Sequence, residues 1–136
     1  MKYVMIAATA LAAATAAHAD GDAAAGEKEF RKCKSCHTIA SADEVIVRGG
    51  KTGPNLYGVV GRAAGSVEDF RYGNDLLAAG EAGLVWDEEQ ITAYIPNPKE
   101  YLADVLDKPA AKSKMAGQRV KDPADVAAYL ATFSDE

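Results

Sequence analysis

Apolar residues recur at helical spacing in four short stretches of this chain. In each stretch they return every three or four positions or stand next to one another, so that they fall on one face of a helix. The stretches are Gly26, Phe30 and Cys33; Ile91, Tyr94 and Ile95; Tyr101, Leu102, Val105 and Leu106; and Val126, Tyr129, Leu130 and Phe133. The pattern predicts four short helices, each with one buried face.

Residues that favour helix starts precede these stretches. They are Asp22; Asp87 with Gln90, as a capping box; Asn97 before Pro98; and Asp122 before Pro123. Asn74 is a further candidate cap, for a short turn with the sequence DLLAA. Pro96 and Pro109 are expected to end or kink the helices before them.

The segment 38–73 has no regular pattern and is rich in glycine, which predicts a long loop. Loops of this length are usually functional. The stretch EVIVR, at 44–48, is the best strand candidate, and it lacks an obvious partner. The predicted fold class is therefore all-α, with short helices and long loops.

The first 19 residues have the pattern of a cleaved signal peptide. Lys2 supplies the positive end, an alanine-rich apolar stretch follows, and Ala17-His18-Ala19 has the small-x-small form of a cleavage site. The apolar run is short for a membrane anchor, which is the alternative interpretation. Cleavage after Ala19 leaves one domain, 20–136, and predicts a periplasmic protein.

Cleavage also limits which partners and which metal ligands the mature chain can have. It removes Lys2, leaving 14 basic and 20 acidic residues, a net charge of −6 that excludes nucleic acid as the default partner. His37 and Met115 become the only histidine and the only methionine. Aromatic residues make up only 7% of the chain, so its core is expected to be thin unless something else fills it.

Both cysteines lie in the motif CKSCH, formed by Cys33, Cys36 and His37. A disulfide between them would close a very small loop and add little stability. A redox dithiol usually stands at a helix start after a strand, whereas a helix precedes this motif. A closed zinc site needs four ligands, and no further cysteine or histidine remains after cleavage.

The spacing C-x-x-C-H is the attachment signal for c-type haem, and it explains all three residues together. Each thiol can add to one vinyl group of the porphyrin. His37 would then be the proximal ligand of the iron. The Pro54 carbonyl, in the stiff sequence TGPN, is a candidate acceptor for the other nitrogen of that imidazole.

The sixth ligand decides between electron transfer and ligand binding. Met115 stands outside any apolar stripe, in the polar sequence AKSKMAGQ, whereas a methionine that fills a core is expected within one. His/Met ligation raises the reduction potential and leaves no open position. The sequence therefore predicts an electron carrier rather than an enzyme.

Several landmarks together resemble class I cytochromes c, and among them the bacterial cytochromes c2. They are CKSCH, TGPNLYGVVGR, Tyr72, Trp86, Tyr94, NPKEYL, the late Met115 and VAAYL, in this order. The resemblance covers essentially all of 20–136 and implies the cytochrome c fold around one covalent haem c.

The resemblance also implies roles for individual residues. Arg62, Tyr72 and Trp86 are expected to bind the inner haem propionate, and Tyr94 to lie near the Met115 sulfur. Gly26 and Phe30 are expected to pack against Tyr129 and Leu130 where the terminal helices cross. Gly117 departs from the family pattern, because many relatives place a phenylalanine there against the haem face.

Basic residues gather in the segments expected to surround the haem edge, despite the negative net charge. They are Lys32, Lys34, Lys51, Lys99, Lys112, Lys114, Arg119 and Lys121. They predict transient docking of a monomer to acidic partners. By resemblance, the donor is a membrane-bound cytochrome bc complex, and the acceptor is a photosynthetic reaction centre or a terminal cytochrome oxidase. A haem enzyme or gas sensor with a displaceable distal ligand, and a thiol-disulfide exchange protein, are the alternatives.

Overall fold

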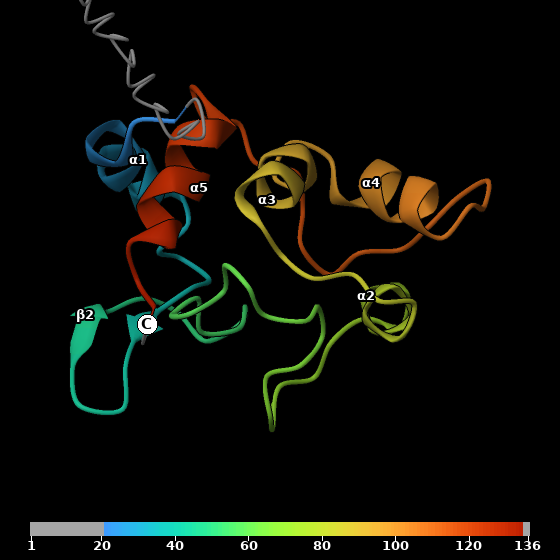
Figure 1. Cartoon of the computed structure of the whole chain (residues 1–136), viewed down its shortest axis with the longest axis horizontal. Helices are drawn as coiled ribbons and strands as arrows, with labels where there is room; N and C mark the ends of the chain where they lie inside the picture. The colour runs from blue at the N-terminus through green and yellow to red at the C-terminus, as the bar shows by residue number, and fades with distance from the viewer. Residues whose placement is uncertain (1–20, 135–136) are drawn as a thin grey trace, which may run out of the picture.

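A computed structural model of the chain describes residues 21–134, and the signal-peptide prediction lies outside this range. The described elements are α1 (Ala23–Glu29), the 3-10 helix η1 (Phe30–Lys32), β1 (Ile39–Ala40), β2 (Val45–Val47), α2 (Asn74–Glu81), α3 (Glu88–Tyr94), α4 (Pro98–Val105) and α5 (Pro123–Ala131). Loops occupy much of the rest (Figure 1). Within 21–134, no helix has the length and apolar character needed to cross a membrane.

The predicted helix starts are mostly confirmed. Asp22, Asp87, Asn97 and Asp122 each accept a hydrogen bond from a backbone N–H of the first turn that follows. These side chains satisfy donors that would otherwise have no partner within the helix.

Two details of the capping predictions are wrong. Asn74 is the first helical residue of α2, and Gly73 precedes it as the cap without a side-chain hydrogen bond. Gln90 does not complete a capping box with Asp87, because its side chain accepts a hydrogen bond from the Tyr101 hydroxyl instead. A tertiary contact between α3 and α4 therefore replaces a local one.

The stretch 44–48 has a strand partner that the sequence did not reveal. Val45–Val47 pairs antiparallel with Ile39–Ala40, with Ile39 opposite Val47 and Ala40 opposite Val45. The partner strand has only two residues, which is too short for a periodic signal. This small ribbon interrupts the long loop, while the architecture remains helical.

The terminal helices cross at a glycine. Figure 1 shows α1 and α5 side by side. A Cβ atom added to Gly26 would lie 1.9 Å from the Asp125 carbonyl oxygen and 2.9 Å from the Tyr129 Cβ. Phe30 packs on Tyr129 with ring centroids 5.6 Å apart. The expected packing of Gly26 and Phe30 on Tyr129 is confirmed, and it holds the helical segment that precedes the cysteine motif against α5.

We expect Gly26→Ala to destabilise the protein. Helix propensity alone would make alanine about 1 kcal/mol more stable than glycine inside a helix. The contact with Asp125 has the opposite effect, since overpacking costs about 1–3 kcal/mol. Unfolding by guanidinium chloride measures the difference. Glu27→Ala, at an exposed position of the same helix, should change the stability little, and a gain in stability for Gly26→Ala would contradict this crossing.

Candidate haem-binding site

One cavity of about 340 Å³ lies between the CKSCH segment, the long loop, α3 and the segment that carries Met115. Every candidate site residue from the sequence lines it: Cys33, Cys36, His37, Pro54, Arg62, Tyr72, Trp86, Tyr94 and Met115. Apolar side chains, among them Phe30, Leu56, Val59 and Leu130, form much of the remaining wall. The structure thus brings together residues spread over most of the domain.

The cysteine motif continues from η1 as a helical turn. The His37 N–H donates to the Cys33 carbonyl at 2.9 Å, and the Cys36 N–H donates to the same oxygen at 3.2 Å. Both thiols are free, Cys33 is partly buried, and Cys36 is exposed. Within 21–134, no cluster of three or more histidine, cysteine and acidic residues forms a metal site.

The two thiols differ in environment. Burial raises the pKa of Cys33 to about 11, and the neighbouring Cys36 contributes in the same direction. Hydrogen bonds with Thr52 and then Ser35 lower the pKa of Cys36. The inner thiol is therefore protonated at neutral pH, while the outer one is closer to ionisation.

His37 is held in one orientation. Its side chain is buried, and its Nδ1–H donates to the Pro54 carbonyl at 2.8 Å, as expected from the sequence. The Nε2 atom of this tautomer carries a lone pair. Burial lowers the pKa of the imidazole, which favours the neutral form that binds metals.

Gly53 is required beside this imidazole. A Cβ atom at Gly53 would lie 2.3 Å from the His37 Cε1 atom, so only glycine lets the loop pack against the ring. Pro54 follows directly and supplies the carbonyl that His37 contacts. The sequence TGPN therefore both packs against and orients the imidazole.

Arg62 is a partly buried cation on the cavity wall. One of its terminal nitrogens donates to the carbonyls of Asn55 and Tyr57, at 3.0 and 3.3 Å. No carboxylate in 21–134 forms an ion pair with it. Burial lowers the pKa of this guanidinium, because removal from water disfavours the charge. An anionic group in the cavity would stabilise it.

Tyr72 and Trp86 are both buried residues of the same wall. The Tyr72 hydroxyl accepts a hydrogen bond from the Val67 N–H at 3.0 Å, so its own proton remains available for a ligand. Trp86 packs on Tyr94 with ring centroids 4.9 Å apart. Phe70, which the sequence reasoning missed, also lines the cavity and packs edge-on against Tyr72.

Met115 is partly buried and is held through its backbone. The Ser113 hydroxyl donates to the Met115 carbonyl at 2.8 Å and accepts from the Met115 N–H at 3.2 Å. Burial raises the pKa of Tyr94, and a hydrogen bond with Ser113 partly offsets this. Ser113 therefore connects Tyr94 to the methionine, a role that no periodic signal in the sequence could have indicated.

The unusual Gly117 has a structural reason. A Cβ atom there would lie 2.3 Å from the Pro96 carbonyl oxygen. The next residue, Gln118, donates its N–H to the Ile95 carbonyl at 2.9 Å. The chain thus passes so close to the end of α3 that a side chain at 117 would require the backbone to move.

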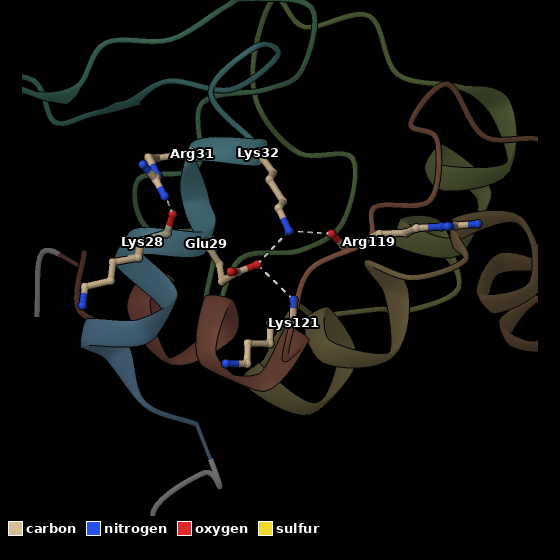
Figure 2. Close-up of polar contacts among 6 residues, drawn as sticks. All are labelled: Lys28, Glu29, Arg31, Lys32, Arg119 and Lys121. Carbon is tan, nitrogen blue, oxygen red and sulfur yellow. Dashed lines mark hydrogen bonds and ion pairs between the residues drawn. The ribbon is translucent and has the colours of Figure 1, made fainter.

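Of the basic residues singled out in the sequence, Lys32, Lys112 and Lys114 line the cavity. The Lys114 ammonium donates to the Arg71 carbonyl at 2.9 Å. The Lys32 ammonium lies between the Glu29 carboxylate and the Arg119 carbonyl (Figure 2). Both of these cations therefore have partners within the chain, and Lys34 and Lys51 are exposed.

No family model matches the chain, whereas individual relatives match it closely. Cytochrome c-551 of Roseobacter denitrificans is 59% identical over 117 residues, covering 85% of this chain and 84% of the relative. Cytochrome c2 of Rhodobacter capsulatus is 51% identical over 134 residues, covering 97% and 98%. The crystal structure of cytochrome c2 from Paracoccus denitrificans superposes with a TM-score of 0.81 at 50% identity, over 85% of this chain and 98% of that structure.

Fold, cysteine motif and cavity together define a class I c-type cytochrome. The chain belongs to the bacterial family of cytochromes c2, c-550 and c-551. This confirms the predicted resemblance and the predicted cytochrome c fold of short helices and long loops. Members of the family are electron carriers with one covalent haem c, and Cys33 and Cys36 have the spacing that this attachment needs.

The cavity fits this group. It has an apolar wall, two free thiols on one helical turn, an oriented imidazole with an available lone pair, and a guanidinium with no carboxylate partner among residues 21–134. A haem has a matching group for each of these features: an apolar macrocycle for the wall, vinyl groups for the thiols, iron for the imidazole and acidic propionates for the guanidinium.

Proposed function

We propose that the protein is a periplasmic one-electron carrier in which His37 and Met115 are the two axial ligands of the haem iron. The observation that carries the proposal is that these residues, from separate segments, line one cavity. They are also the only histidine and the only methionine outside the first 19 residues.

His37 is suited to be the proximal ligand. Its hydrogen bond to Pro54 fixes the tautomer and leaves Nε2 as the coordinating atom. Met115 is suited to the other position, because Ser113 restrains its backbone on both the N–H and the carbonyl. A thioether ligand favours ferrous iron and raises the reduction potential.

Arg62, Tyr72 and Trp86 would bind the buried propionate. The charge on Arg62 offsets the cost of burying a carboxylate, and the Tyr72 hydroxyl has a proton to donate. Haem supplies a reversible one-electron change at the iron. The residues of this chain hold it, exclude water from most of it and tune its potential.

The exposed Cys36 marks the edge where electrons would enter and leave, since Cys33 is the inner cysteine. Lys34 lies two residues before Cys36, and Lys51 precedes Thr52, which hydrogen-bonds to Cys36. Both lysines are exposed, and they favour an acidic partner surface. We propose a membrane-bound cytochrome bc complex as donor and a photosynthetic reaction centre or terminal oxidase as acceptor. The signal-like first 19 residues support the periplasmic location.

Carbon monoxide separates this function from a gas sensor or haem enzyme. The reduced protein should bind little carbon monoxide at neutral pH, because Met115 occupies the position that the gas needs. Spectroscopic titration measures this directly. Rapid, stoichiometric uptake would indicate a displaceable distal ligand and contradict the electron-carrier proposal.

A further inference from the structure

Met115 lies in a segment without helix or strand. We call residues 106–121, between the end of α4 and the start of α5, the Met115 strap. No regular hydrogen-bond ladder holds this strap, so its position depends on contacts with the rest of the molecule. Two of these contacts are made by carboxylates from outside the strap.

Asp75 holds the strap on the side that precedes Met115. Its carboxylate, in the first turn of α2, accepts a hydrogen bond from the Lys112 backbone N–H at 2.6 Å. The Lys108 ammonium donates to the other carboxylate oxygen. The Asp75 side chain is only 14% exposed. One carboxylate therefore contacts the strap at two points, one of them through the main chain.

Glu29 holds the strap on the side that follows Met115 (Figure 2). Its Oε2 atom accepts from the Lys121 backbone N–H at 2.9 Å and from the Lys32 ammonium at 3.2 Å. Lys32 in turn donates to the Arg119 carbonyl at 3.0 Å. Glu29 thus connects the end of α1, next to the cysteine motif, to the end of the strap.

Both carboxylates are suited to this task at neutral pH. Hydrogen bonding with Lys108, and then with the Lys112 N–H, lowers the pKa of Asp75. The Lys121 N–H, and then Lys32, lower the pKa of Glu29. Each group is therefore ionised, and hydrogen bonds to a charged acceptor are the stronger kind.

We infer that Asp75 and Glu29 are positioning residues that keep Met115 on the iron by clamping the two ends of its strap. The inference rests on the proposed ligation by Met115. Because both carboxylates bind main-chain N–H groups, the clamp needs the acids and does not need the side chains of Lys112 and Lys121. Removing either acid should let Met115 leave the iron more often.

The test uses the ferric holoprotein and imidazole, a small neutral ligand of haem iron. At saturating imidazole, the rate of uptake equals the rate at which Met115 leaves. We expect Asp75→Asn and Glu29→Gln each to raise this rate about tenfold, because each weakens a charge-assisted hydrogen bond. The double variant should approach about a hundredfold, since the two sites share no partner.

Matched controls separate positioning from other effects. Asp104→Asn and Glu27→Gln remove one exposed negative charge each and should leave the rate unchanged. Lys121→Gln keeps its backbone N–H group and should stay within about twofold of the wild-type rate. Ile39→Val removes one methylene group from a fully buried core residue in β1, outside the strap and its contacts, and should not speed uptake, which would show that global stability is not the cause.

Imidazole uptake at the wild-type rate in both Asp75→Asn and Glu29→Gln would overturn the clamp alone, provided that Met115→Leu takes up imidazole much faster than the wild type. If Met115→Leu and the wild type take it up equally fast, Met115 is not a ligand. That second result would overturn the proposed ligation, and the clamp with it.

Discussion

Replacing Met115 with leucine should lower the reduction potential by about 0.1 V or more while the haem stays attached. Leucine has a similar volume, so the packing changes little, and the cysteines are untouched. The thioether that stabilises ferrous iron is lost, and axial ligands spread haem potentials over roughly 0.8 V. Redox titration of the purified variant against the wild type measures the shift.

The matched control is Leu76→Met, at a partly buried position on the same cavity wall. It alters the lining without removing a proposed ligand, and its potential should remain close to that of the wild type. An unchanged potential in Met115→Leu would mean that the sixth ligand is misassigned.

Replacing Cys36 with serine should remove one of the two thioether bonds and impair maturation. A hydroxyl does not form the bond that a thiol forms with a vinyl group. The remaining haem would be attached through Cys33 alone. After denaturation in alkaline pyridine, the absorption band of the haem should move to longer wavelength, because one vinyl group remains unsaturated.

Ser35→Ala, between the two cysteines, is the control and should mature normally. The double variant Cys33→Ser with Cys36→Ser should lose its colour on a denaturing gel. Attachment through two thioethers in Cys36→Ser would contradict the assignment, since the chain has no third cysteine.

The sequence predicted well what is decided locally. The caps at Asp22, Asn97 and Asp122 depend on residues two or three positions away, and the structure confirms them. CKSCH places two thiols and an imidazole on one turn whatever the rest of the chain does. The hydrogen bond between His37 and Pro54 joins residues 17 positions apart, and it was still predicted, because a proximal histidine needs an acceptor and TGPN supplies one.

The structure could not be predicted from the sequence where it depends on contacts between residues far apart in the chain. The two-residue strand Ile39–Ala40 has no periodicity of its own, and only its pairing with Val45–Val47 reveals it. Gln90 contacts Tyr101 rather than its own helix start. The role of Asp75 could not be predicted from the sequence, where it is an ordinary acidic residue. Its partner, the Lys112 N–H, lies far along the chain.

Some site residues were predicted only from the resemblance to class I cytochromes c, and not from any physical pattern in the sequence. Arg62, Tyr72, Trp86 and Tyr94 are ordinary polar and aromatic residues by periodicity alone. The structure places all four on the cavity wall. Arg62 is a partly buried cation with no carboxylate partner in the described part of the chain, which gives it a physical reason to face an acidic group.

Proton NMR of the reduced wild-type protein tests the central claim most directly. A methionine methyl group bound to iron lies over the porphyrin ring, whose ring current shifts its resonance far upfield of all other signals. Met115 is the only methionine beyond the first 19 residues. Ligation by Met115 therefore predicts one isolated three-proton signal that disappears in Met115→Leu. A spectrum without this signal would contradict ligation of the iron by His37 and Met115.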